Sequence, residues 1–327
     1  MSKVKKQHYV PQFYLKRFTY DGERLFVFDK IAQKQRVANV KDIAHENYFY
    51  DIPIDSLHEE VEVNNFDVQV VEKALGGIEG KYSQTIKEVL ENLEPTNGLK
   101  RLLNFLKFRG GRIITKKQKR ELSFFITIQF LRTKESRDAT AEMSKKFTEV
   151  IFNAFTENNF PEIPADLHPQ VEIDKNDTKL FHLQNLFNPE YVNSITKVLN
   201  NHIWILGINK SKQSLYTSDH PVVKNGSIKS PFRSFEGLGS KGIEIAIPLT
   251  PNHILLIYEK TFFNELKNLD RKIIDLNEDN VIYYNSLQVL QSYRQIYCSA
   301  NDFNLVKDMC QENPNLGKSK KDRITVS

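Results

Sequence analysis

The longest uninterrupted helical pattern, Lys116–Asn158, most constrains how this chain folds, because its first half is apolar on every side of a helical wheel. That half carries the bulky apolar residues Leu122, Phe124, Phe125, Ile126, Ile128, Phe130 and Leu131. A helix that is apolar all round is buried on all sides, whereas a surface helix has one apolar stripe. We therefore expect a buried helix here, followed by a second helix or a continuation over Asp138–Asn158.

Short apolar runs bounded by turn residues predict strands near both ends of the chain. Near the start, Arg24–Asp29 alternates in polarity, and His45–Tyr50 predicts a second short strand or an aromatic plug. From His202 onward there are four further runs, at 203–208, 215–217, 243–247 and 254–258. The chain is therefore expected to be α+β, with a predominantly helical body packed on a small, mostly antiparallel sheet formed by N-terminal and C-terminal strands.

Three more segments have helical periodicity, Leu57–Leu93, Asp177–Asn200 and Asn280–Ser299. The pair Gly76-Gly77 is expected to kink or split the first of them. We expect a single α+β domain over residues 1–310, with a helical excursion near 138–200. The lysine-rich residues 311–327 are expected to form a basic, disordered tail.

Composition excludes several classes of protein. No run of about eighteen apolar residues could span a bilayer, and Met1–Gln7 is not followed by the apolar core of a secretory signal. We expect a cytoplasmic protein without membrane contact. Two cysteines are too few for a disulfide framework or a four-ligand zinc site. The net charge of +5 is mild and lies partly in the tails, so it allows a nucleic acid or nucleotide partner without indicating one.

Residues 237–242 match the letters of the dinucleotide-binding motif G-x-G-x-x-G. That motif requires a strand before it and a helix after it, because the helix N-terminus binds the pyrophosphate. Ile243 and the residues after it read as a strand, so we reject this interpretation.

The most informative motif is the N-terminal box His8–Phe18, with the sequence HYVPQFYLKRF. Pro11 is compatible with the first turn of a helix, which places His8 just before the helix N-terminus, where anions are favoured. His8 is thus a candidate ligand or base, with Gln12 and Tyr14 as binding residues. In the alternative, His8 caps the helix and Tyr14 belongs to the core.

A second box, Thr217–Pro221, lies where one strand ends and another begins. Because the residue before a proline is held extended, Asp219 and His220 are expected to point away from each other. Asp219 either closes an Asx-turn or presents its carboxylate from a rigid strand end, and His220 is a candidate binding residue.

In the buried helix, Gln129 and Arg132 are three residues apart and share one face. A buried guanidinium needs a partner. Arg132 either forms an internal ion pair or binds a substrate phosphate or carboxylate. Glu72 and Glu79, seven residues apart, are candidate partners, metal ligands or surface charges.

Taken together, these pieces resemble a known family. Its specific parts here are the box from His8 and the Ser-Asp-x-Pro box, and further matches are Asn47–Tyr50, Val71-Glu72, Ile78-Glu79, Gln129–Arg132 and Ile247–Pro251. The chain resembles domain-of-unknown-function family 4238, bacterial proteins of similar length, from about His8 to beyond Tyr258. Members commonly carry Asn where this chain has His220, which favours Asp219 as the functional residue. The resemblance brings no established activity, but it implies that the separated boxes form one site.

Our leading hypothesis is a hydrolase of phosphodiester bonds, such as a nuclease in bacterial defence. His8 and Asp219 would bind Mg²⁺ or Mn²⁺ or act as base, assisted by Glu72 or Glu79, and Arg132 would stabilise the phosphoryl charge. Four residues would contribute to binding, Gln12, Tyr14, Gln129 and His220. The alternative is a non-catalytic ligand- or partner-binding protein whose boxes are structural.

Overall fold

The structure is a computed structural model that describes residues 4–53, 67–93, 111–164, 171–230 and 234–318. Its strands are β1 (Lys6–His8), β2 (Arg24–Asp29), β3 (Lys34–Asn39), β4 (His45–Asn47), β5 (Ile203–Asn209), β6 (Thr217–Ser218), β7 (Val223–Gly226), β8 (Ile243–Thr250), β9 (His253–Tyr258), β10 (Lys272–Leu276) and β11 (Gln295–Cys298). The α-helices are α1 (Gln12–Leu15), α2 (Val70–Leu93), α4 (Lys116–Leu131), α5 (Lys134–Asn159), α6 (Lys175–Phe187), α7 (Pro189–Asn201), α8 (Glu278–Gln291) and α9 (Asn304–Glu312). Short 3-10 helices are η1 (Lys16–Phe18), η2 (Val40–Asp42), η6 (Asn264–Leu269) and η7 (Pro314–Gly317).

The strands form three sheets. The largest has the order β10-β5-β9-β8-β7 and is antiparallel except for the parallel pair β10 and β5. A four-stranded antiparallel sheet has the order β3-β2-β11-β6, so strands from both ends of the chain lie side by side. A third sheet contains only β1 and β4, which pair His8 with His45.

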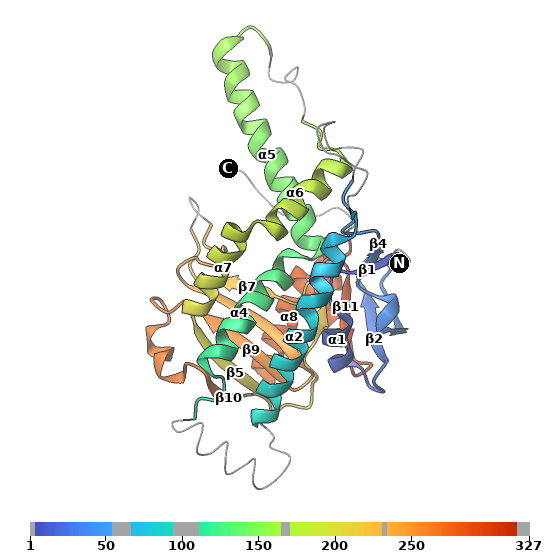
Figure 1. The fold of residues 1–327 in the computed structure, drawn as a ribbon, viewed down its shortest axis with the longest axis vertical. Helices are drawn as coiled ribbons and strands as arrows, with labels where there is room; N and C mark the ends of the chain where they lie inside the picture. Colours follow the sequence, from blue (N-terminus) through green and yellow to red (C-terminus); the bar gives the residue numbers. More distant parts are fainter. Residues whose placement is uncertain (1–3, 54–66, 94–110, 165–170, 231–233, 319–327) are drawn as a thin grey trace.

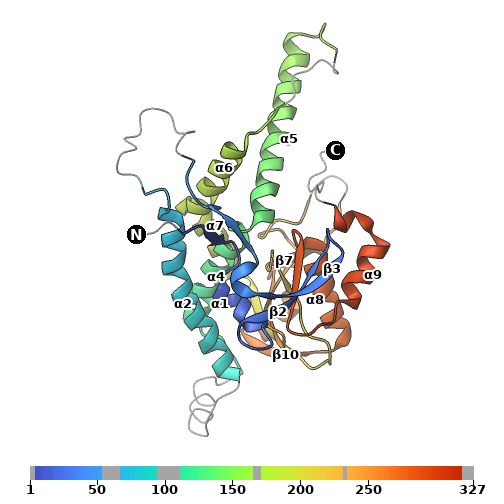
Figure 2. The same cartoon turned by 90° about the vertical axis from the view of Figure 1, so that its right-hand side faces the viewer.

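Helices cover both faces of the five-stranded sheet (Figures 1 and 2). Along β5, Trp204 and Leu206 belong to the cluster that includes the buried residues of α2 and α4. Their neighbours Ile203 and Ile205 belong to a second cluster with α8. This alternation follows from the two-residue period of a strand, which sends successive side chains to opposite faces.

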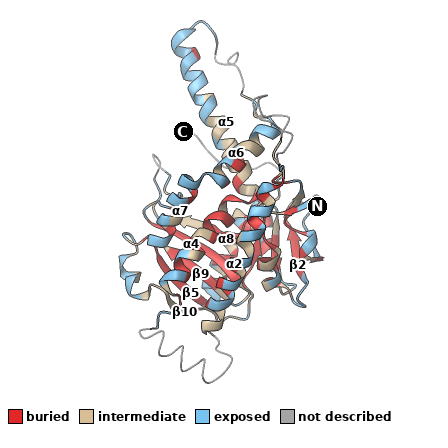
Figure 3. Ribbon diagram, in the orientation of Figure 1, coloured by how far each residue is buried: buried red, intermediate tan, exposed pale blue. Residues whose placement is uncertain are grey.

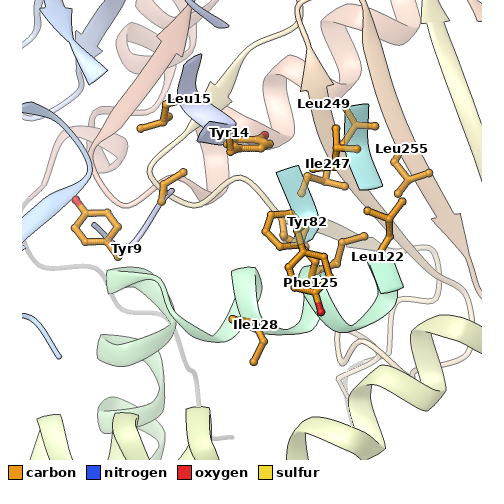
Figure 4. Packing of buried hydrophobic residues seen from close by; sticks show 14 of the residues in the cluster. Tyr9, Tyr14, Leu15, Tyr82, Leu122, Phe125, Ile128, Ile247, Leu249 and Leu255 are labelled. Carbon is orange, nitrogen blue, oxygen red and sulfur yellow. The ribbon is translucent and has the colours of Figure 1, made fainter. Parts of the chain in front are cut away.

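The helix α4 lies in the larger cluster, as its sequence predicts. Phe125 and Leu122 pack near Tyr82 of α2 and close to Ile247 of β8 (Figure 4), and Figure 3 shows buried residues on the helices and strands of this contact. The helix starts with a capping box, in which Thr115 accepts from the backbone of Gln118 and the Gln118 side chain accepts from that of Thr115. This pair satisfies two N–H groups that a helix start leaves without partners.

The predicted α+β class is confirmed, and the sheet of N-terminal and C-terminal strands is the four-stranded one. The larger mixed sheet is an addition to the expected architecture. The helix predicted over Asn280–Ser299 is wrong at its end, because α8 stops at Gln291 and Gln295–Cys298 is β11. The Gly76-Gly77 pair does not split α2, which runs from Val70 to Leu93, while residues 57–66 lie outside the described ranges.

The predicted excursion near 138–200 corresponds to α5, α6 and α7, of which α5 extends away from the body (Figures 1 and 2). Asn188 ends α6 and caps α7, which has Pro189 in its first turn. Residues 311–318, assigned to a tail on sequence grounds, include η7 with the buried Leu316, and residues 319–327 lie outside the described ranges. Within the part of the chain described, no helix combines the length and apolarity needed to cross a membrane.

Candidate functional site

The N-terminal box folds as a strand followed by one short helix. His8 ends β1, Pro11 precedes α1, and α1 has only four residues before η1 continues the chain. A helix this short has few aligned peptide dipoles, so it is a poor anion site. The expectation of an anion bound at this helix start therefore loses its physical basis. The strand position of His8 also rules out the helix-cap alternative.

The His8 imidazole is neutral at neutral pH. Burial, the nearby His45 ring and the charge of Arg132 lower its pKa to about 4, against a smaller opposing effect of the Val40 backbone. Its Nδ1 lies 3.5 Å from the Gln12 amide nitrogen, and its ring contacts His45 edge-on at 5.2 Å. The other ring nitrogen, Nε2, is buried, and among the described residues no group meets it within hydrogen-bond distance and angle.

Arg132 lies at the centre of a polar cluster. Its side chain is 2% exposed and forms an ion pair with Glu79 at 2.8 Å. A second guanidinium nitrogen donates to the carbonyl oxygen of His8 at 2.7 Å, and Nε donates to the Tyr50 hydroxyl at 3.2 Å. Burial disfavours the charge, but the Tyr50 hydroxyl and the Glu79 carboxylate outweigh it and raise the pKa of Arg132. The ion-pair alternative for Arg132 is therefore the one that the structure contains.

Glu72 lies beside this cluster. Burial raises the pKa of its carboxyl group to about 7, the negative charges of Glu79 and Asp51 add to the effect, and Arg132 opposes it. Its Oε2 is buried, and no hydrogen-bond partner for it lies within the described ranges of the chain. A carboxyl group of this kind exchanges its proton near neutral pH, which is a property of general acids and bases.

Gln129 and Arg132 hold α4 against the N-terminal box. The Gln129 amide donates to the Tyr9 carbonyl oxygen at 3.3 Å, and Arg132 binds the preceding carbonyl, that of His8. The Gln129 side chain is fully buried, and its amide nitrogen is bonded to the protein's own backbone.

Asp219 binds the protein's own backbone. One carboxylate oxygen accepts from the N–H of Tyr293 at 2.7 Å, and the other accepts from those of Arg294 at 2.8 Å and Gln295 at 2.7 Å. Asp219 is 1% exposed. It therefore secures the turn between α8 and β11, and the structure gives it this structural role; a catalytic or metal-binding role for Asp219 stays a prediction.

Tyr14 has a similar structural role. It is fully buried, and its hydroxyl donates to the carbonyl oxygen of Pro248 and contacts the Thr217 hydroxyl at 2.9 Å. It thus connects the first box with the Thr217–Pro221 box and with β8. The two boxes do meet, as the resemblance implies, but through core contacts.

His220 differs from the other box residues because it lines a cavity. Its Nδ1 lies 2.7 Å from the Thr133 hydroxyl, and its ring packs on Phe130 at 5.4 Å. The cavity has a volume of about 530 Å³. Its polar lining consists of Glu135, Ser136, His220, Lys224, Asn225, Glu236 and Gln291, and its apolar lining of Phe130, Ala139, Leu287 and Leu290.

A second cavity of about 260 Å³ adjoins the first, since both are lined by Phe130, Lys224 and Glu236. The Lys224 ammonium group donates to the Glu236 carbonyl oxygen between them, and burial lowers its pKa. Gly237 and Gly239, from the rejected dinucleotide motif, line this second cavity, and the following β8 shows that the motif is followed by a strand.

The predicted metal ligands do not form a metal centre. Among the described residues, which include all four candidates, no group of three or more His, Cys, Asp or Glu side chains could hold a metal ion. Glu72 and Glu79 lie next to Arg132, whereas Asp219 is saturated by backbone N–H groups. These side chains therefore do not fit the expected Mg²⁺ or Mn²⁺ site.

Sequence reasoning missed three parts of this region. Tyr50 and His45 were seen only as aromatic or strand residues, and the cavity residue Lys224 carried no motif. The run Tyr48-Phe49-Tyr50 was a signal for the first, because a buried tyrosine needs a partner for its hydroxyl. The cavity is built from α5, α8 and β7, which no local pattern connects.

Comparison with known proteins gives one result. A family model described as "Protein of unknown function (DUF4238)" matches residues 6–302. No curated protein and no solved structure matches the chain. Since the match spans most of the sequence and includes both boxes, the chain belongs to the DUF4238 family of proteins of unknown function.

Proposed function

We propose that this protein binds a nucleotide-sized polar ligand in the cavity beside His220, and that its sequence boxes form the scaffold of that cavity. The observation that carries the proposal is the position of His220. Its side chain lines a cavity of about 530 Å³, whereas the side chains of Arg132 and Asp219 are bonded to other groups of the protein. Small-molecule sites typically measure about 300–1,000 Å³ and combine apolar walls with a few polar groups.

The lining supplies complementary groups for such a ligand. Phe130 provides an aromatic wall at the junction of the two cavities, where a base can stack. Lys224 provides the positive charge for a phosphate, and Glu135 and Glu236 provide acceptors for sugar hydroxyl groups. A nucleotide would therefore use both the charged and the apolar parts of the lining.

We place this function in the bacterial cytoplasm. The family resemblance supports the bacterial origin. Cys298 and Cys310 are free and buried, which suits a reducing compartment. The alternative occupant of the cavity is the end of a nucleic acid strand instead of a free nucleotide.

Filling the cavity tests the proposal. Ala139 lines it, so Ala139→Phe should block it, whereas Asn153→Phe, on the exposed part of the same helix, should not. We expect nucleoside mono- and triphosphates to raise the melting temperature of the natural protein and of Asn153→Phe, and not of Ala139→Phe. Isothermal titration calorimetry should give the same ranking. If none of these nucleotides binds, or if Ala139→Phe binds as well as its control, the proposal fails.

The second candidate is phosphodiester hydrolysis at the Arg132 cluster, which would give a nuclease suited to bacterial defence. The observation that favours it is the environment of Glu72. Its carboxyl group has a pKa raised to about 7, lies near the Arg132 guanidinium group, and has one oxygen, Oε2, without a hydrogen-bond partner among the described residues. Glu72 would donate a proton to the leaving oxygen, the neutral His8 imidazole would accept one from water, and the positive charge of Arg132 would stabilise the phosphoryl group.

Hydrolysis of bis(p-nitrophenyl) phosphate and of single-stranded DNA and RNA tests this second candidate. Glu72→Gln and His8→Ala should each reduce the rate at least about 100-fold if the groups act as acid and base. Glu91→Gln, in the exposed last part of the same helix, is the control. Full activity in both site variants, or no hydrolysis by the natural protein, would exclude this candidate.

A further inference from the structure

The distal part of α5 has its apolar side towards solvent. Its exposed apolar residues are Met143 (57%), Phe147 (66%), Val150 (49%), Ile151 (54%), Phe152 (43%) and Phe155 (56%). At 3.6 residues per turn all of them except Phe152 lie within an arc of about 140° on one side of the helix, and Phe152 lies about 60° beyond its edge. On another side, the side chains of Glu142 and Lys146 are only 18% and 29% exposed. A surface helix normally has the opposite arrangement, so something else covers this apolar side.

We propose that a second copy of this chain covers it, with the two α5 helices packed antiparallel about a two-fold axis at Ile151. The proposal concerns assembly and does not depend on the ligand or the chemistry proposed above. Exposed apolar patches of this size mark interaction surfaces, and symmetric dimers are the commonest assemblies of soluble proteins.

The position of the exposed residues fits this arrangement. An axis at Ile151 places Phe147 opposite Phe155 of the second copy, and Met143 opposite the last helical residue, Asn159. The overlap is then 143–159, the part of α5 that extends from the body in Figures 1 and 2.

The charges fit an antiparallel pair better than a parallel one. Lys146 and Glu157 lie on the same flank of the apolar arc, on either side of Ile151. In the antiparallel pair, Lys146 lies within one residue of Glu157 of the second copy, and the contact occurs twice. In a parallel pair Lys146 of one copy and Glu157 of the other would lie on opposite flanks of the interface, so this contact would be absent.

The exposed apolar area of this arc is about two thirds of one side of a standard interface. Since an aromatic side chain buries about 150–250 Å², the exposed fractions of the five apolar side chains amount to roughly 500 Å² per chain. A standard interface buries about 800 Å² per partner, including its polar rim. The five residues, with the flanking polar ones, therefore approach the area of a stable dimer.

Light scattering coupled to size-exclusion chromatography of the full chain tests the assembly. We expect the natural protein to be a dimer at micromolar concentration and Ile151→Asp to be a monomer. Asn153→Asp, exposed on another side of the same helix, should remain a dimer. Circular dichroism should be the same for all three, because Ile151 is not part of the core. A monomeric natural protein, or equal effects of the two variants, would overturn the proposal.

Cysteine cross-linking tests the geometry. Ile151→Cys lies on the two-fold axis and should form an intermolecular disulfide in oxidised glutathione, whereas Met143→Cys should not. The native Cys298 and Cys310 are buried and give a low background. Equal cross-linking at both positions contradicts the axis. A monomer that instead floats with phospholipid vesicles of mixed neutral and anionic lipid would overturn the proposal in favour of a lipid surface.

Discussion

The guanidinium group of Arg132 donates to the main-chain carbonyl oxygen of His8 at 2.7 Å, across 124 positions of the chain. The conspicuous arginine of the buried helix therefore holds the backbone of the N-terminal box in place. In this protein the two boxes support the fold through core contacts, and His220 of the second box lines a cavity that could receive a ligand.

We predict that Arg132→Met lowers the free energy of unfolding by about 3 kcal/mol, because it leaves the partly buried Glu79 and the His8 carbonyl without their partner. Urea denaturation measures the change. Lys87→Met removes an exposed pair with Glu91 on α2 and should cost less than about 1 kcal/mol. If Arg132→Met were as stable as the natural protein, the cluster around Arg132 would not hold α4 to the N-terminal box.

Asp219→Asn should lower the free energy of unfolding by about 2 kcal/mol. The amide replaces one of the two acceptor oxygens by a donor that faces backbone N–H groups. Thermal unfolding provides the measurement, with Asp275→Asn, whose side chain is 68% exposed, as the neutral comparison. A stable variant that has lost ligand binding or hydrolysis would instead return Asp219 to the functional residues.

Stability should depend on pH through Glu72. Its pKa rises from 4.5 to about 7 on folding, so between these values the folded state binds more protons than the unfolded state, and stability falls as pH rises. Above about pH 7 the penalty is complete and the slope disappears. Glu72→Gln should match the natural protein near pH 4.5 and exceed it at pH 8 by about 1 kcal/mol, a value reduced for the partial exposure of the group. Equal pH profiles of the two proteins in urea denaturation would contradict the assignment.

Two glycine substitutions should act in opposite directions. A Cβ at Gly207 of β5 would lie 2.7 Å from a Leu276 methyl carbon and 2.9 Å from one of Ile254, so Gly207→Ala should cost about 1–3 kcal/mol. Gly77 lies within α2 with open space around it, and Gly77→Ala should stabilise by about 0.5–1 kcal/mol through helix propensity. The melting temperatures of the two variants provide the measurement. If Gly207→Ala left the stability unchanged, β10 would be able to shift away from β5.

The sequence predicts elements whose own apolar pattern reveals them. The alternation of polarity over Arg24–Asp29 predicts the strand β2, and the all-round apolar pattern predicts the helix α4. The structure contains both elements. The sequence does not predict the elements that form only because a neighbouring strand pairs with them. Lys34–Asn39 is a polar edge strand that exists because β2 pairs with it, and Gln295–Cys298 is a strand because it lies between β2 and β6.

The same distinction applies to the site. The need of a buried guanidinium for a partner predicts an ion pair for Arg132, with Glu72 and Glu79 as the candidates, and the structure contains the pair with Glu79. The partners of Asp219 are not predictable in this way. Its local alternative was an Asx-turn, but its carboxylate binds N–H groups 74–76 positions later. Contacts at such separations depend on the topology, which no spacing in the sequence encodes.

The pairing of β2 with β11 also affects how the protein is made. Asp29 of β2 lies opposite Gln295 of β11, so the four-stranded sheet cannot close until nearly the whole chain has left the ribosome. Until β11 is available, the sheet that contains β2 and β3 is incomplete. Contacts of such long range also form slowly. Synthesis and refolding in vitro should therefore be limited by the arrival of the C-terminal strand, and a chain truncated before Gln295 should be a substrate for chaperones.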